Sequence, residues 1–137
     1  MYSHYENTQV ITASPERILI MLYEGAIRFS KLALDKIRKR EPAGKGVFIG
    51  KALAIVGELR STLDHKIGGE IARQLERLYL YLTDELTRAN LTNSEEAMEN
   101  VINILSHLRD TWVEAVDIAR SEREAALQSG ARLRAAG

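Results

Sequence analysis

The stretch SPERILIMLYEGAIRFSKLALDKIRKR, residues 14–40, has the features of a long amphipathic helix. Ser14 can cap the free amides of the first turn, and Pro15 fits the first helical position. Apolar residues then recur every three or four positions, at Ile18, Leu22, Ala26, Phe29, Ala33 and Ile37. A run of Lys and Arg closes the stretch, which suits the negative end of a helix dipole. The pattern predicts a helix with one stripe facing a core.

Three further segments repeat this pattern, so we expect an all-α fold, an antiparallel up-down four-helix bundle. The predicted helices cover residues 15–40, 45–64, 70–89 and 94–120. Short links between them favour antiparallel neighbours. A mobile N-terminal arm at 1–13 and a partly disordered or helical tail at 121–137 complete one domain of 137 residues.

Individual residues refine this arrangement. The second segment is apolar around much of its circumference and therefore needs two helical partners. Its Gly50 and Gly57 are expected to let another backbone approach closely. In the third segment Ile71 is expected on the core stripe, and Thr92 has capping-box spacing to Glu95 at the start of the fourth.

Composition removes several function classes. Nineteen Lys and Arg balance nineteen Asp and Glu, so the chain lacks the basic excess that is typical of nucleic-acid binders. No cysteine is present for a disulfide or a thiolate metal site. The longest apolar run, residues 18–23, is too short for membrane insertion, and residues 1–7 do not resemble a signal peptide. We expect a cytoplasmic protein.

Catalytic, metal and cofactor sites find no support in the sequence. None of the three histidines follows a glutamate at the spacing used by di-iron bundles, so no metal is expected. No serine, threonine or lysine stands in an activating constellation, which argues against an enzyme. A phosphotransfer bundle remains an alternative through His107 and Arg109, although Asp110 would repel a phosphohistidine.

The second and third segments carry more apolar surface than a solvated bundle needs. This excess indicates either a crowded core or a groove for a partner helix. The arm favours the groove, because it has apolar and aromatic residues without helical periodicity, at Tyr2, Tyr5, Val10 and Ile11. Such an arm could lie in an apolar groove and be displaced by a partner.

Several blocks of the chain resemble the FliS family of flagellin export chaperones. The first is TASPERILIMLYEGA at residues 12–26, which is similar to the opening helix of the family. The central blocks are Leu63-Asp64, GGEIA at 68–72, Leu78-Tyr79 with Tyr81, and Ala89-Asn90. LRDTW at 108–112 is similar to the end of the fourth helix of the family. Leu80 departs from the pattern, because the family usually has Asp there.

The resemblance implies a chaperone that binds the disordered C-terminal segment of flagellin and prevents its premature polymerisation. It also implies delivery of flagellin to the flagellar type III export gate. The residues that we expect to line the flagellin-binding groove are Ile55, Thr62, Leu75, Tyr79 and Leu82. A homodimer of the unliganded protein is a further expectation, and a generic helical adaptor is the remaining alternative.

Overall fold

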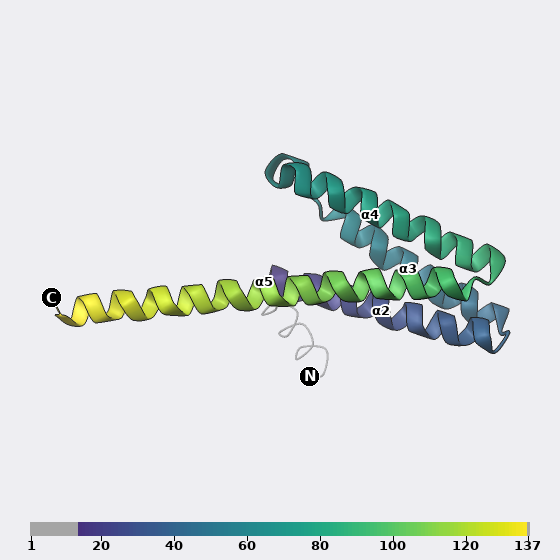
Figure 1. The fold of residues 1–137 in the computed structure, drawn as a ribbon, viewed down its shortest axis with the longest axis horizontal. Coiled ribbons are helices and arrows are strands. Elements are labelled where there is room, and N and C mark those ends of the chain that lie inside the picture. The colour runs from purple at the N-terminus through teal and green to yellow at the C-terminus, as the bar shows by residue number, and fades with distance from the viewer. Residues whose placement is uncertain (1–13, 137) are drawn as a thin grey trace, which may run out of the picture.

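The computed structural model describes residues 14–136, which form α2 (Pro15–Arg38), α3 (Pro42–Ser61), α4 (His65–Thr92) and α5 (Glu95–Ala136). Successive helices run antiparallel and pack as a closed ring, in which α2 and α4 each contact α3 and α5 (Figure 1). No strand occurs between residues 14 and 136. The predicted all-α bundle is confirmed. The predicted arm, with Tyr2, Tyr5, Val10 and Ile11, lies outside the described residues.

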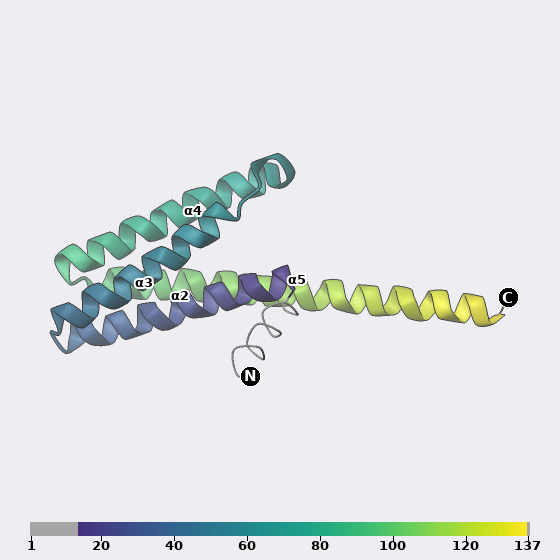
Figure 2. The ribbon, with the colours of Figure 1, turned by 180° about the vertical axis from the view of Figure 1, so that it is seen from behind.

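The α3–α4 hairpin is tilted away from α2 and α5. All four helices meet at the end that carries the α2–α3 and α4–α5 turns, which we call the closed end (Figures 1 and 2). At the other end, which we call the open end, the α3–α4 turn stands apart from α5. Within residues 14–136, no helix is both long enough and apolar enough to cross a membrane.

Each of the first two helices, α2 and α3, begins with a proline in its first turn. Ser14 Oγ accepts a hydrogen bond from the Arg17 amide at 3.2 Å, and Pro15 occupies the first turn, as predicted. The second helix begins at Pro42, three residues before the predicted start, because proline at a first position needs no backbone donor. It ends at Ser61 rather than residue 64.

The third helix begins five residues before its predicted start. The Asp64 carboxylate accepts hydrogen bonds from the amides of Lys66 at 3.0 Å and Ile67 at 3.1 Å, which caps α4. Gly69 then interrupts the helix with φ 53° and ψ −125°, a backbone conformation that glycine adopts without steric penalty. The first turn of α4 is therefore offset from the rest of the helix.

The fourth helix is much longer than predicted. Ser94 Oγ accepts a hydrogen bond from the Ala97 amide at 3.1 Å, so the predicted cap at Thr92 is wrong. Thr92 belongs to α4, and its hydroxyl donates to the Arg88 carbonyl at 2.7 Å. From Glu95 the helix continues for 42 residues and projects well beyond the open end (Figure 1). The predicted tail is thus helical up to Ala136, with mostly exposed side chains.

The core lies where the four helices converge. Its large members that are almost fully buried are Ile49, Val56, Leu59, Leu82, Leu86, Met98, Val101 and Leu105. Some residues that were predicted to face the core do not; among them, Ile18 is 43% exposed and Ile71 is 67% exposed. Both lie toward the open end of the bundle.

A glycine does allow close packing, but on a different helix from the one expected. A Cβ added to Gly25 on α2 would lie 3.2 Å from Ile55 Cδ1 of α3. At Gly50 and Gly57 an added Cβ would meet no heavy atom within 4 Å, so the prediction that these glycines admit another backbone is wrong. The second segment nevertheless has the two partners predicted for it, α2 and α4.

Candidate binding groove

The divergence of the hairpin leaves an apolar depression at the open end, with a volume of about 270 Å³. Side chains from α2, α4 and α5 and from the α3–α4 turn line it. The apolar ones are Leu19, Leu63, Ile67, Ile71, Ala72, Leu75, Tyr79 and Trp112. Leu19 and Trp112 also border a second depression of about 550 Å³, which runs along α5 past Val116 to Ala126. We call the two adjoining depressions the open groove.

Apolar exposure at the α3–α4 turn follows from the local sequence. The Asp64 cap starts a single helical turn, and Gly69 breaks it, so Ile67 lies on a short segment that has no helix opposite it. Ile67 is 87% exposed. Large apolar residues exposed together at a concave site are characteristic of a binding surface.

The floor of the open groove is a hydrogen-bonded aromatic cluster. The hydroxyl groups of Tyr23 and Tyr79 form a buried hydrogen bond, and Trp112 Nε1 donates to Tyr23 Oη at 3.3 Å. Burial raises the pKa of both tyrosine hydroxyls, and the bond to Tyr23 raises the pKa of Tyr79 further. Both phenols therefore stay neutral at physiological pH. The cluster joins α2, α4 and α5 and fixes the position of the tryptophan ring.

The structure brings together three of the five residues that we expected to line a groove. Thr62, Leu75 and Tyr79 border the open groove. Leu82 is fully buried in the core, and Ile55 is half-buried against Gly25 of α2, so neither borders it.

Sequence reasoning missed six of the eight apolar residues that line the first depression: Leu19, Leu63, Ile67, Ile71, Ala72 and Trp112. The glycine pair at 68–69 between two isoleucines was the available signal, because a break in the helix disrupts the apolar stripe and leaves its residues without a partner.

Neither histidine of the described region lines the open groove. His65 Nε2 lies 3.1 Å from Glu76 Oε2, and the same carboxylate also pairs with Arg60 Nη2 at 3.2 Å. His107 is exposed on α5, and the nearby Arg109 is already paired with Asp110 at 3.0 Å. Within residues 14–136, no three His, Asp or Glu side chains lie close enough together to hold a metal ion.

The geometry therefore supports binding by apolar contact. A helix bundle that is closed at one end and has an open apolar groove at the other belongs to the class of helical binding proteins. The family model "Flagellar protein FliS" matches residues 1–119. The chain belongs to the FliS family, as the sequence blocks indicated. This is a chaperone family rather than an enzyme family, which removes the phosphotransfer alternative.

Relatives from several bacteria extend over most of the chain. The flagellar secretion chaperone FliS of Campylobacter jejuni is 37% identical over 113 residues, which cover 82% of this chain and 88% of the relative. The flagellar secretion chaperone FliSB of Pseudomonas aeruginosa is 35% identical over 104 residues, covering 76% and 82%. The Bacillus subtilis FliS is 30% identical over 122 residues, covering 89% and 90%.

Proposed function

We propose that this protein is a cytoplasmic flagellar secretion chaperone whose open groove binds the C-terminal segment of flagellin. The observation that carries the proposal is the predominantly apolar lining from Ile67 and Ile71 through Trp112 to Ala126. Family membership and relatives that are named flagellar secretion chaperones support it. In this proposal the loaded chaperone delivers flagellin to the export gate.

The physical basis is coupled folding and binding. A disordered segment loses conformational entropy when it becomes ordered, so it binds stably only by burying a long apolar face. The open groove follows α5 past the start of α2, which suits an extended amphipathic helix better than a compact ligand. Burial of that face withholds it from other flagellin molecules and thereby prevents polymerisation.

We further propose that residues 1–13 cover the open groove when flagellin is absent. This segment joins the described chain at Ser14, next to the groove residues Glu16 and Leu19. Its apolar residues, Tyr2, Tyr5, Val10 and Ile11, match the character of the lining. A homodimer would be a second way to cover the same surface, and native mass spectrometry of the free protein distinguishes the two.

Titration with a peptide from the last 40 or so residues of the host flagellin tests the proposal. Trp112 is the single tryptophan of the chain and lines the groove, so its fluorescence should change on binding. Circular dichroism should show a gain of helix, and calorimetry a negative heat-capacity change.

Matched variants locate the contact. Ile71→Asp places a charge in the groove at a side chain that is already exposed, and it should weaken binding at least about tenfold while the bundle stays folded. Leu91→Asp is the control, because Leu91 is 77% exposed near the closed end of α4. Equal affinities of the two variants would remove the open groove from the binding site.

A further inference from the structure

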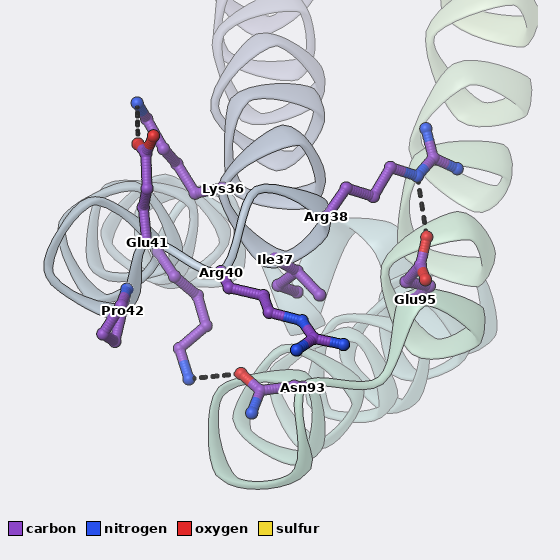
Figure 3. A pocket seen from close by; sticks show the side chains of 9 residues that line it. Lys36, Ile37, Arg38, Arg40, Glu41, Pro42, Asn93 and Glu95 are labelled. Carbon is purple, nitrogen blue, oxygen red and sulfur yellow. Dashed lines mark hydrogen bonds and ion pairs between the residues drawn. The ribbon is translucent and has the colours of Figure 1, made fainter.

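A second pocket lies at the closed end, across the molecule from the open groove. It has a volume of about 540 Å³ and lies between the α2–α3 turn and the α4–α5 turn (Figure 3). In contrast to the apolar lining of the open groove, charged side chains dominate here. Four are cations, Lys36, Arg38, Arg40 and Lys45, and two are carboxylates, Glu41 and Glu95.

Two of the cations are already paired with carboxylates. Lys36 Nζ lies 2.6 Å from Glu41 Oε2, and Arg38 Nε lies 2.7 Å from Glu95 Oε1. Arg38 also reaches Glu99 at 3.2 Å from its Nη2 atom. These pairs show that carboxylate groups fit this surface and where they sit on it.

The other two cations have no carboxylate partner within residues 14–136. Lys45 Nζ donates to the carbonyl of Asn90 at 2.9 Å and to Asn93 Oδ1 at 2.8 Å, both neutral acceptors. The Arg40 guanidinium forms no hydrogen bond or ion pair within that described range, and only the Arg40 backbone amide donates, to the Ile37 carbonyl at 3.1 Å. The guanidinium extends over Ile37 toward Asn93 and Glu95 (Figure 3). Among the residues that line the pocket, four cations stand against two carboxylates, an excess of two positive charges.

The backbone of Arg40 adopts a strained conformation. Arg40 has φ 56° and occupies the position just past the end of α2, where the Glu41 amide donates back to the Lys36 carbonyl at 2.9 Å. Helices that end in this way usually have glycine there, because a side chain is strained at positive φ. Strain retained at one residue is a reason to look for a function of its side chain.

We propose that this pocket binds carboxylate side chains of an acidic peptide from a partner protein, through Arg40 and Lys45. Carboxylates are favoured over phosphate groups because Glu41 and Glu95 remain in the pocket and would repel a dianion more strongly than single charges. Two separate carboxylates can each meet one unneutralised cation. Since the open groove lies at the other end of the bundle, the acidic partner and the groove ligand can be bound at once.

The probe for this site is a fluorescein-labelled peptide of six glutamates, titrated at low salt and followed by fluorescence anisotropy. The decisive variant is Arg40→Gly, which removes the guanidinium and relieves the strained backbone, so it should melt no lower than the wild type. We expect it to bind the peptide about tenfold more weakly, the loss typical of one charge-assisted hydrogen bond. The Arg132→Gln variant, altered on the projecting part of α5, should bind like the wild type.

Each result bears on the proposal. Equal affinity of Arg40→Gly and wild type, or no binding by the wild type, overturns it. Displacement of the peptide by inorganic phosphate at concentrations where acetate has no effect would mark a phosphate site and overturn the carboxylate assignment. Arg40→Gly should bind the flagellin peptide normally, so this test and that of the open groove fail independently.

Discussion

The two ends of the bundle use similar apolar residues and reach opposite outcomes. At the closed end Ile37, Ile49, Leu86 and Met98 are buried between all four helices. At the open end Ile67 and Ile71 are exposed. Helical spacing makes an apolar face in both places, but only convergence of the helices turns that face into a core. Where the hairpin tilts away, the same face becomes a groove (Figure 2).

The sharpest test of this contrast compares one truncation at each end. Leu86→Ala leaves a cavity in a fully buried site and should lower the free energy of unfolding by about 2–5 kcal/mol. Ile71→Ala removes an exposed side chain and should change it by less than about 0.5 kcal/mol. Urea denaturation measures both, and similar losses would show that the open end is packed like a core.

Removal of the buried phenol bond should have an intermediate effect. Tyr79→Phe deletes one partner of the Tyr23–Tyr79 bond and should lower the free energy of unfolding by about 1–2 kcal/mol. Tyr81→Phe is the matched control on the same helix, because Tyr81 is 45% exposed and makes no comparable bond within residues 14–136. Equal stability of the two variants would contradict a structural role for the aromatic floor.

The same tyrosines predict a sensitivity to alkali. Their pKa values are raised in the folded protein, so their contribution to stability is complete below the ordinary tyrosine value of about 10. It is lost as the pH rises above that value, because the unfolded chain releases those protons more readily. Absorbance at the phenolate wavelength should rise for these two groups only together with unfolding. Their ionisation in the folded state would contradict the buried bond.

A smaller loss of stability is expected at low pH, through a carboxylate that lies nearer the closed end. The Glu85 carboxylate accepts hydrogen bonds from Arg88 Nε at 3.0 Å and Asn100 Nδ2 at 3.2 Å, and these partners lower its pKa, the arginine most. Its contribution is present above the ordinary glutamate pKa of about 4.3 and is lost as the pH falls through the depressed value. Urea denaturation at pH 7 and pH 3 should show less acid loss for Glu85→Gln than for the exposed control Glu114→Gln.

The smallest effect on folding is expected from the projecting end of α5. A chain that ends at Arg120 loses side chains that are mostly exposed, so its free energy of unfolding should change by less than about 0.5 kcal/mol. The helical circular dichroism signal should fall with the residues removed. A large loss of stability would mean that the projecting segment packs on the bundle.

The sequence predicted the number and direction of the helices, because each has its own apolar stripe and Ser14 and Pro15 mark the first start. It did not predict the extent of α5. Beyond Arg120 large apolar residues no longer recur every three or four positions. Residues with high helix propensity nevertheless extend a helix that has already formed. The sequence did not predict the tilt of the α3–α4 hairpin either, and the exposure of Ile71 depends on that tilt. A periodic pattern identifies an apolar face without identifying what opposes it.

The same limit applies to the open groove. Thr62, Leu75 and Tyr79 border it, because Thr62 lies in the α3–α4 turn and the other two lie on the part of α4 that follows this turn; their contact with a partner stays a prediction. Leu82 lies on the same helix as Leu75 and Tyr79 but further toward the closed end, where it is fully buried in the core. Trp112 was named only as part of the LRDTW block, although it both bonds to Tyr23 and lines the groove. One side chain with two roles cannot be resolved by periodicity.

The long fourth helix also governs how the molecule moves through solution. At 1.5 Å per residue its 42 residues extend for about 63 Å, much of it as a thin rod beyond a small bundle. Friction on such a rod slows translation and makes tumbling anisotropic. A monomer of 15.4 kDa will therefore elute from a gel-filtration column ahead of globular standards of its mass. Its apparent mass could then be mistaken for that of a dimer. Light scattering, which weighs particles without regard to their shape, gives the assembly state directly.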